Sequence, residues 1–507
     1  MNQVTNSNGN GENGQQLRQL EKIAQSASEA EPSGVKESLV TFQTAEGLEV
    51  DGVPTRVTRH TVVFELYNPS VVPRLSEVLS EFKIVLQDRT IYSGRSVVRN
   101  VVDVGSTAVC EVTLNEAYWM EVEAGLNTAQ NGQLVREFNT FLNEWQKLYR
   151  VLPEFKVVIA DMQTFLMDLR LWLDQVELQI RASPSAAWAQ LERSVIDNLA
   201  EPAIRGIDAF IDRFETIAAG LEVELQPAHR AYLRRQLHPL VLSSPFAYRA
   251  FHKPLGYAGD YQVVDMMVRP PYEGGTLFAK IINVWLLGQL PSQAHRNRVA
   301  YLERKLVEET ARVRAQGRTA RIFNLGCGPA AEVQHFFAEQ RVSEQADLTL
   351  VDFNQETLQH LHKALKEIEH KLCRRFSVRL VKKSVHQILR EAGRTARRRP
   401  EDQYDFVYFA GLFDYLSDNV CKQLINIFYE MLGPGGLLLA TNVNDALNIS
   451  RPFRYSMEYI LDWNLIYRSR NRVATLAPEG AAADDVVVKA EDTGTNVFLE
   501  VRKPNDA

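Results

Sequence analysis

Asn324-Leu325-Gly326-Cys327-Gly328-Pro329-Ala330 is the stretch that decides the fold, because two closely spaced glycines follow an apolar run and precede a helical pattern. The run before it, residues 321–325, is typical of a short buried strand. Glycine lets the backbone turn sharply and lets a ligand approach it closely. A strand that ends in such a turn and passes into a helix is typical of the first βα unit of a doubly wound sheet.

An acidic residue completes this pattern at the end of the next apolar run. Asp352 lies 24 residues after Gly328, where a carboxylate can accept hydrogen bonds from both hydroxyls of a ribose. Ala330 stands where a dinucleotide fingerprint has its third glycine, and Pro329 lacks an N–H for a pyrophosphate. Both departures favour a nucleoside ligand without phosphates. The structural alternative is a plain turn from strand to helix.

The chain from residue 245 onward alternates between strand-like and helical patterns. The strand-like runs are residues 321–325, 348–352, 378–381, 406–409 and 436–440. Repeated βα units predict an α/β fold with a parallel, Rossmann-like sheet. Two later runs, 486–488 and 497–501, flank Gly494 and predict an antiparallel hairpin at the edge of this sheet.

The N-terminal half is organised differently. Residues 1–36 are rich in Asn, Gly, Gln, Ser and Glu and predict a disordered tail, because large apolar residues are sparse. Residues 37–115 contain several short β-branched runs separated by turn signals, which favours a small β-barrel.

Residues 116–244 follow a helical period. Apolar residues recur at steps of three and four from Phe138 to Ile180, a heptad seam that Pro153 interrupts. We expect a kink, or two helices meeting, at that proline. The seam either packs within one chain as a helical bundle or joins two copies in a homodimer, and the spacing leaves both open.

Composition excludes several classes of protein. The 507 residues carry 57 Lys and Arg against 63 Asp and Glu, and a net charge of −6 makes a poor general nucleic-acid binder. The four cysteines lie far apart, which argues against a structural zinc site and a disulfide scaffold. No apolar run reaches about 18 residues, and the N-terminus lacks a signal segment. We expect a cytoplasmic protein without a membrane span and without a metal.

On these motifs, residues 245–507 resemble a class I S-adenosylmethionine-dependent methyltransferase. The resemblance implies S-adenosylmethionine as the cofactor, with Gly326, Cys327 and Gly328 as its first motif and Asp352 as its ribose-binding acid. Asn324 replaces a frequent acidic residue of that motif, and Ser384 stands where the family usually has an acid beside adenine. The complete set of implied cofactor-binding residues is Asn324, Gly326, Cys327, Gly328, Asp352, Phe353, Ser384, Val385, Ala410 and Gly411.

A narrower resemblance rests on residues 252–261, 411–418 and 457–463. These segments are similar to the family of biosynthesis proteins for an extracellular factor, 3-hydroxypalmitic acid methyl ester, whose members make a quorum-signalling fatty acid methyl ester. The resemblance implies an acyl substrate and esterification of its carboxyl group. It makes candidates of two groups: catalytic His252, Tyr257 and Asp260, and substrate-lining Tyr261, Phe413, Glu458, Tyr459 and Trp463.

These candidate residues could also have purely structural roles. The segment 252–261 is either a lid over the cofactor or a structural loop, and residues 457–463 either line a pocket or pack in a core. A carboxylate acceptor is ionised at pH 7 and needs no general base, whereas a hydroxyl or amine would need one such as His252 or Asp260. Methylation of another small molecule or a protein, and a cofactor-binding regulatory module, stay open as alternative functions.

The barrel segment resembles a degenerate PilZ domain, the family that binds cyclic di-GMP. The resemblance implies nucleotide contacts from Arg56, Arg59, Asn68 and Ser70. The two arginines are one residue too close for that family, and Pro73 stands where it has a glycine. A purely structural or docking barrel is therefore the alternative.

Overall fold

The structure is a computed structural model, and it describes residues 38–67, 71–86, 89–103, 107–115, 118–119, 151–392, 403–445 and 453–505. The chain divides into two compact units, Met1–Asn139 and Thr140–Ala507, which we describe separately. The predicted disordered tail and the first part of the predicted heptad seam lie outside the described residues. Within the described ranges, no helix is long and apolar enough to cross a membrane.

The first unit contains a closed antiparallel barrel of six strands, as predicted. In chain order the strands are β1 (Leu39–Gln43), β2 (Glu49–Val57), β3 (Thr61–Tyr67), β4 (Val78–Leu86), β5 (Arg89–Asp103) and β6 (Thr107–Leu114). Around the barrel their order is β1-β2-β3-β6-β5-β4. Phe42, Phe64 and Phe82 fill the interior with ring centroids 5.5–6.0 Å apart, so side chains close the barrel from inside.

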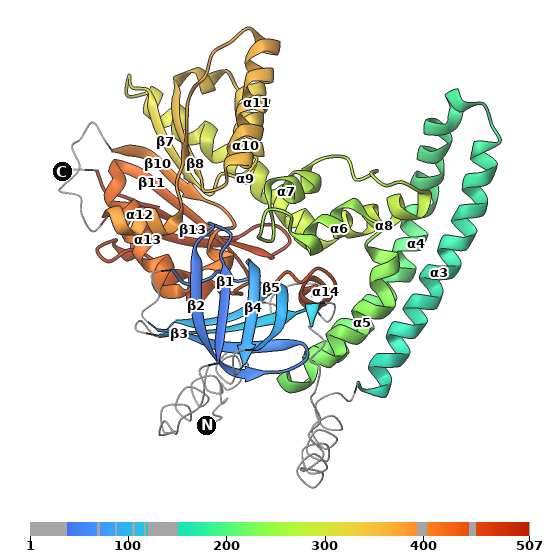
Figure 1. Ribbon diagram of the computed structural model, residues 1–507. Coiled ribbons are helices and arrows are strands. Elements are labelled where there is room, and N and C mark those ends of the chain that lie inside the picture. The colour runs from blue at the N-terminus through green and yellow to red at the C-terminus, as the bar shows by residue number, and fades with distance from the viewer. Residues whose placement is uncertain are drawn as a thin grey trace, which may run out of the picture. The chain divides into compact units, whose positions relative to one another are not determined.

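The second unit is built on a seven-stranded sheet. Its strands are β7 (Ala320–Leu325), β8 (Ala346–Asp352), β9 (Ser377–Lys382), β10 (Tyr404–Phe409), β11 (Leu432–Val443), β12 (Val486–Ala490) and β13 (Asn496–Arg502). Their spatial order is β12-β13-β11-β10-β7-β8-β9, and β13 runs antiparallel to both neighbours (Figure 1). The predicted α/β fold is confirmed: β7 to β11 form a parallel sheet, and β13 and β12 extend it at one edge. The predicted terminal hairpin is β12–β13, with Gly494 in the turn.

Helices cover both faces of this sheet. The helices α9 (Leu290–Arg314), α10 (Ala331–Glu339) and α11 (Gln355–Leu372) share a hydrophobic core with β7, β8 and β10 on one face. The opposite face packs against α12 (Val385–Ala392), α13 (Asp418–Met431) and α15 (Arg470–Ala474). The chain passes from β7 to β8 and β9 on one side and then returns to β10 on the other. Such a reversal of strand order opens a crevice at the carboxyl ends of the strands.

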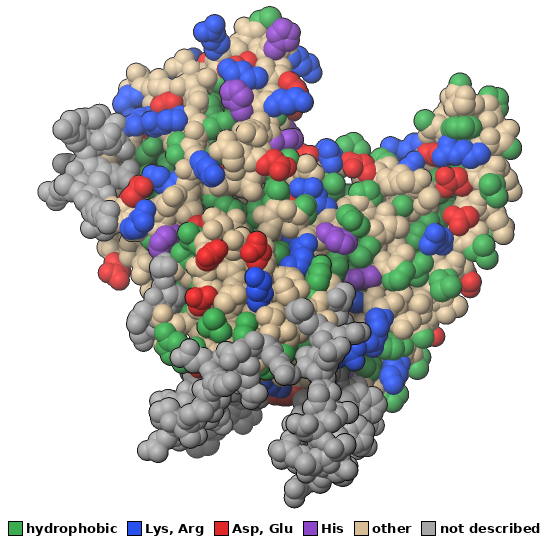
Figure 2. Space-filling model, in the orientation of Figure 1, with side chains coloured by type: hydrophobic (Ala, Val, Ile, Leu, Met, Phe, Trp, Pro, Cys, Tyr) green, Lys and Arg blue, Asp and Glu red, His purple; other side chains and the backbone are tan. Residues whose placement is uncertain are grey.

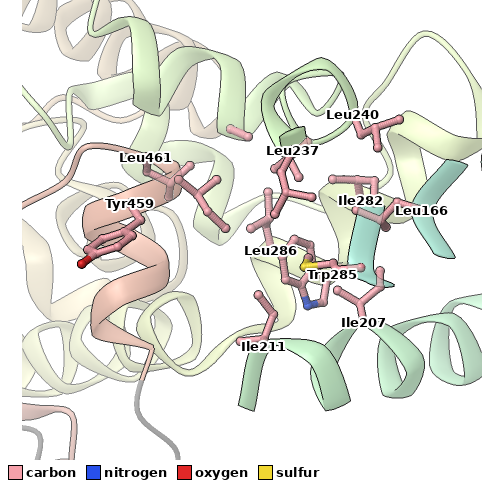
Figure 3. Close-up of a cluster of buried hydrophobic side chains, with 14 of the residues drawn as sticks. Leu166, Ile207, Ile211, Leu237, Leu240, Ile282, Trp285, Leu286, Tyr459 and Leu461 are labelled. Atoms are coloured by element: carbon pink, nitrogen blue, oxygen red, sulfur yellow. The ribbon is translucent and has the colours of Figure 1, made fainter. Parts of the chain in front are cut away.

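The remaining helices form an arm beside the sheet (Figure 1). They are α3 (Pro153–Arg181), α4 (Trp188–Ala219), α5 (Gln226–Val241), α6 (Pro245–His252), α7 (Tyr261–Val268) and α8 (Leu277–Gly288). The arm shares one core with α14 (Arg454–Ile460), a helix that follows β11. Figure 3 shows this core, with Leu166, Ile207, Leu237 and Trp285 from four arm helices and Leu461 from the end of α14.

The helical seam is buried inside the chain along its described length. Phe155, Ile159, Met162 and Leu166 are each at most 1% exposed and pack in the arm's core. Pro153 begins α3, where its missing N–H costs no hydrogen bond. Outside this core, α3 also carries exposed apolar side chains at Met167, Leu171 and Leu178. Intramolecular packing therefore uses the predicted seam, and homodimerisation stays a prediction.

Candidate functional site

The glycine bend follows β7 directly. Gly326 and Gly328 both have left-handed backbones, with φ of 67° and 53°. The N–H groups of Gly326 and Cys327 donate to the carbonyl of Val351 at 2.8 and 3.1 Å, which ties the bend to the end of β8. Side chains at the two glycine positions would be strained, since L residues rarely adopt this conformation. The bend therefore needs glycine for its path.

Asp352 holds the same bend from the end of β8. Its buried carboxylate accepts hydrogen bonds from the N–H of Gly328 at 3.1 Å and from the N–H of Asn354 at 2.9 Å. The next residue, Phe353, packs its ring 5.0 Å from the ring of Tyr257. The structure thus brings together the predicted ribose-binding acid, the glycine bend and one residue of the predicted lid.

The predicted adenine-side residues lie one strand further along the sheet. Ser384 follows β9 and accepts a hydrogen bond from the N–H of Gln387 at 3.3 Å, while its own N–H donates to the side-chain oxygen of Gln387 at 3.0 Å. This reciprocal pair caps the start of α12. Val385 is buried in the hydrophobic core beneath α12 and α13. Neither side chain lines the cavity described next.

A cavity of about 190 Å³ begins at the glycine bend and extends toward α7, α9 and the segment 453–467. Among the predicted cofactor residues, Asn324, Gly326, Cys327, Gly328, Ala410 and Gly411 line it. Its charged or titratable wall residues include His295, Arg298, Glu332, Asp414, Tyr415, Arg454 and Tyr467. Its apolar wall residues include Val264, Met267, Leu290, Ala294, Val299, Leu302, Phe453, Met457 and Trp463. The site is therefore an apolar chamber with a few polar groups near the ends of β7 and β10.

A buried acid, Glu332, and a buried amide, Asn324, line this chamber. Glu332, in the first turn of α10, accepts hydrogen bonds from the Tyr408 hydroxyl at 2.9 Å and from Nδ2 of Asn324 at 3.3 Å. Burial raises the pKa of Glu332 above its usual range. In the described part of the chain, the Oδ1 atom of Asn324 is buried and has no hydrogen-bond partner. An unsatisfied buried acceptor is costly, so this atom is suited to a ligand donor.

An arginine and a histidine of α9 face the end of β10. Arg298 donates from Nη2 to Nδ1 of His295 at 2.9 Å. Burial, with Arg298 and Arg296 nearby, holds the pKa of His295 well below its usual value, so the ring is neutral and can accept this bond. Gly411 has φ of 81°, and a Cβ built there would lie 3.1 Å from Nη2 of Arg298. Glycine at 411 therefore makes room for the guanidinium.

Asp414 lies on the same wall, in the turn after β10. Its Oδ1 accepts a hydrogen bond from the N–H of Val443 at 2.7 Å. Burial raises its pKa to about 6, although the positive charges of Arg298 and Arg468 oppose the shift. A carboxyl group with this pKa is mostly ionised at neutral pH and is more basic than an ordinary aspartate, which suits a general base.

Trp463, a predicted substrate residue, lines the cavity. Its indole N–H donates to the Tyr415 hydroxyl at 2.8 Å. A Cβ built on Gly259 would lie 2.9 Å from the Trp463 ring and 3.0 Å from the Tyr415 hydroxyl. The glycine therefore lets the segment before α7 close tightly over this pair.

Other predicted residues lie outside the cavity wall. His252 stacks on Tyr248 with ring centroids 4.0 Å apart, and Phe413 packs against Phe409 at 4.6 Å. The hydroxyl of Tyr261 donates to Oε1 of Glu356 at 2.9 Å. Their catalytic or substrate roles stay predictions.

Three further candidates have structural partners. Asp260 caps α7 by accepting from the N–H groups of residues 262 and 263, and it pairs with Arg249 at 2.9 Å. Glu458 pairs with Arg454 at 2.8 Å, which keeps that arginine on the cavity wall. Tyr459 is buried among Phe155 and Phe214 in the core that the arm shares with α14 (Figure 3).

For the barrel, the structure places Arg56 in β2 and Arg59 in the turn after it, both exposed. The carbonyl of Arg59 accepts a hydrogen bond from the Trp119 indole at 3.0 Å. Asn68 and Ser70 lie outside the described residues. Nucleotide binding there stays a prediction.

Sequence reasoning missed the residues that line the cavity from elsewhere in the chain, namely His295, Arg298, Glu332 and Arg454. His295 and Arg298 could have been found from the sequence, because they interrupt an apolar stripe of a predicted helix. Ala294 lies one turn before Arg298 on this stripe, and Leu302 lies one turn after it. No group of three or more His, Cys, Asp or Glu side chains able to hold a metal occurs within the described ranges.

Comparisons with known proteins give distant structural likenesses. No protein-family model matches the chain, and no curated protein matches it. A possible exported protein from Bordetella parapertussis is 17% identical, with 60% of this chain and 97% of that chain covered and a TM-score of 0.41. An O-methyltransferase family protein from Burkholderia thailandensis is 12% identical, with 57% and 75% covered and a TM-score of 0.32. The N-methyltransferase NodS from Bradyrhizobium japonicum WM9, in complex with S-adenosyl-L-homocysteine, is 14% identical, with 48% and 98% covered and a TM-score of 0.28.

Proposed function

We propose that this chain is an S-adenosylmethionine-dependent methyltransferase. The single observation that carries the proposal is the glycine bend at the reversal of strand order, which is held by Asp352 and lines a mainly apolar chamber. Ligands of doubly wound sheets bind at this reversal, outside the carboxyl ends of the strands.

The residues at the bend suit this cofactor. Each oxygen of Asp352 accepts a hydrogen bond from a backbone N–H, and because a carboxylate oxygen can accept more than one bond, a ribose hydroxyl is a suitable donor to it. The orphaned Oδ1 of Asn324 would accept from the ammonium of the amino-acid end. A Cβ built on Gly328 would meet no atom within 4 Å, so there is open space beside the bend for a ligand. When bound, the cofactor supplies an electrophilic methyl group on a sulfonium.

For the acceptor we propose the carboxyl group of a 3-hydroxy fatty acid, which would give a signalling methyl ester. The apolar wall of the chamber suits an acyl chain, and a carboxylate needs no base to react. Anion and sulfonium neutralise each other in the transition state, so a chamber that excludes water favours the reaction. In this mechanism the chain contributes positioning and desolvation.

A second candidate is methyl transfer to a hydroxyl or amine, which Asp414 favours. A carboxylate of pKa about 6 on the cavity wall is suited to accept the proton that such an acceptor must lose. Asp414→Asn separates the two candidates. It should lower a base-dependent rate by about 10²–10⁴-fold and leave carboxyl methylation within about tenfold.

The proposal is tested first by binding and then by turnover. Titration calorimetry of the full chain with S-adenosylmethionine should show binding, and Asp352→Ala should weaken it at least tenfold. Incubation with methyl-labelled cofactor and 3-hydroxy fatty acids, followed by mass spectrometry, should detect labelled methyl esters. Binding without any methylated product from acids, alcohols, amines or proteins would instead support a cofactor-binding regulatory module. Absence of binding would refute both.

A further inference from the structure

Two arginines line the chamber, and they differ in the ion pairs and hydrogen bonds that they form within the protein. Arg454 forms an ion pair with Glu458 at 2.8 Å, and its guanidinium also lies 4.9 Å from the centroid of the Tyr467 ring. Arg298 forms a hydrogen bond with neutral His295 and, among the described residues, no ion pair. A guanidinium has five N–H donors, so Arg298 keeps donors for an anion.

The surroundings of Arg298 make an unpaired cation costly. The side chain is half-buried in a chamber lined by apolar groups, and it faces the end of β10 at Gly411. Glu332 and Asp414 are near enough for its charge to lower their pKa values against the effect of burial, but neither forms an ion pair with it. An incoming carboxylate would therefore gain a charge-assisted bond in a partly enclosed, mainly apolar site, where such bonds are stronger than in bulk water.

The neighbours of Arg298 indicate what is attached to this carboxylate. Ala294 and Leu302 lie one turn before and after it on α9, and Val264, Met267 and Met457 belong to the same wall. A charged head beside such a surface fits an amphipathic acid. We propose that Arg298 is the specificity-determining residue of the site and binds the carboxylate of an amphipathic methyl acceptor, with His295 as the positioning residue that orients its guanidinium. This inference rests on the proposed function.

The proposal gives a balanced reaction. Arg298 holds one carboxylate oxygen, and a lone pair of the other oxygen forms the new O–C bond to the methyl group. The C–S bond breaks, its electron pair stays on sulfur as a neutral thioether, and no proton moves. The ester that results is uncharged and cannot pair with Arg298. The site should therefore bind the acid and release the ester.

Calorimetry on the full chain saturated with S-adenosyl-L-homocysteine tests this directly, with 3-hydroxydecanoate and its methyl ester as probes. Wild-type protein should bind the acid at least tenfold more tightly than the ester. Arg298→Gln should weaken acid binding by about 10- to 100-fold and leave ester binding within twofold. The control Arg304→Gln removes an exposed arginine of the same helix and should change neither.

Cofactor ligands show whether Arg298 serves the acceptor or the cofactor. 5′-Methylthioadenosine lacks the amino-acid end that S-adenosyl-L-homocysteine carries. For each of these two nucleosides, the affinity of Arg298→Gln should lie within twofold of the wild-type affinity. A loss confined to S-adenosyl-L-homocysteine would overturn the proposal, since the guanidinium would then hold the cofactor's carboxylate. Unchanged acid affinity in Arg298→Gln, or no preference of wild type for the acid, would overturn it as well.

Arg298→Lys covers the case in which the glutamine variant does not fold. Lysine keeps the charge but loses the fork of donors, so acid binding should fall about three- to tenfold while 5′-methylthioadenosine still binds. An acid affinity within twofold of wild type would overturn the proposal. Failure of wild type to bind either nucleoside would instead refute the proposed function, so the two failures are distinguishable.

Discussion

Glu215 on α4 is hydrogen-bonded to Ser456 in the first turn of α14, accepting from both its N–H and its hydroxyl at 2.6 Å. The N–H of Tyr455 donates to the same carboxylate at 3.1 Å. At the other end of α14, Arg234 of α5 donates to the carbonyl of Tyr459 and to Asp462, each at 2.8 Å. The arm therefore holds both ends of a helix whose neighbouring residues form the far wall of the chamber.

This arrangement predicts that Glu215→Gln weakens binding of the methyl acceptor and leaves binding of the cofactor unchanged. Glutamine would place an N–H donor where the carboxylate accepts three hydrogen bonds, so the free energy of unfolding should fall by about 1–3 kcal/mol. Acceptor affinity should fall, and 5′-methylthioadenosine should bind as in wild type. Thermal unfolding and calorimetry measure both effects.

Glu201→Gln is the matched control, because Glu201 lies on the same helix in an exposed pair with Arg205. It should change neither stability nor binding. If Glu215→Gln leaves the acceptor affinity unchanged, the arm does not shape the chamber.

Gly411→Ala tests the close approach of Arg298 to β10. A Cβ at this position would lie 3.1 Å from the guanidinium, on a backbone with φ of 81°. We expect a loss of about 1 kcal/mol in stability from the backbone and a weaker affinity for 3-hydroxydecanoate from the displaced arginine. Gly317→Ala is the control, because Gly317 has a similar φ of 75° and a Cβ built there would meet no atom within 4 Å. It should lower the stability by a similar amount and leave the affinity for 3-hydroxydecanoate unchanged. Equal affinities in the two variants would contradict this account of Gly411.

Asp414 should make folding stability depend on pH. Its folded-state pKa of about 6 lies above that of an unfolded aspartate, so the folded protein keeps a proton that the unfolded chain releases. The free energy of unfolding should therefore fall as the pH rises from 5 to 7, by about 1 kcal/mol from this residue. Urea unfolding at both values should show a smaller decrease in Asp414→Asn than in wild type. An identical decrease would mean that the residue is already ionised at pH 5.

For the barrel we expect no micromolar binding of cyclic di-GMP. Arg56 in β2 and Arg59 in the turn that follows are one residue closer together than the arginine pair of the family that the barrel segment resembles. Calorimetry on the full chain checks this. A micromolar or tighter dissociation constant that Arg59→Ala abolishes would show that the barrel is a nucleotide sensor.

Charged side chains of both signs occur on the surface of the protein. On the face that Figure 2 draws, Lys and Arg side chains are interspersed with Asp and Glu. Nucleic-acid binders concentrate positive charge on one face, and poor binding of nucleic acid stays a prediction from composition.

Local pattern was enough to predict the barrel, the parallel sheet, the terminal hairpin and the glycine bend with Asp352. Each of these depends on hydrophobic period and turn chemistry within a few residues, which a sequence displays directly. Only the tertiary structure placed Arg298, Glu332, Asp414 and Arg454 around one cavity. It also placed His252 and Tyr459 away from that cavity. The packing of α9, α10 and α14 decides which side chains meet, and contacts between distant segments have no local signature in the sequence.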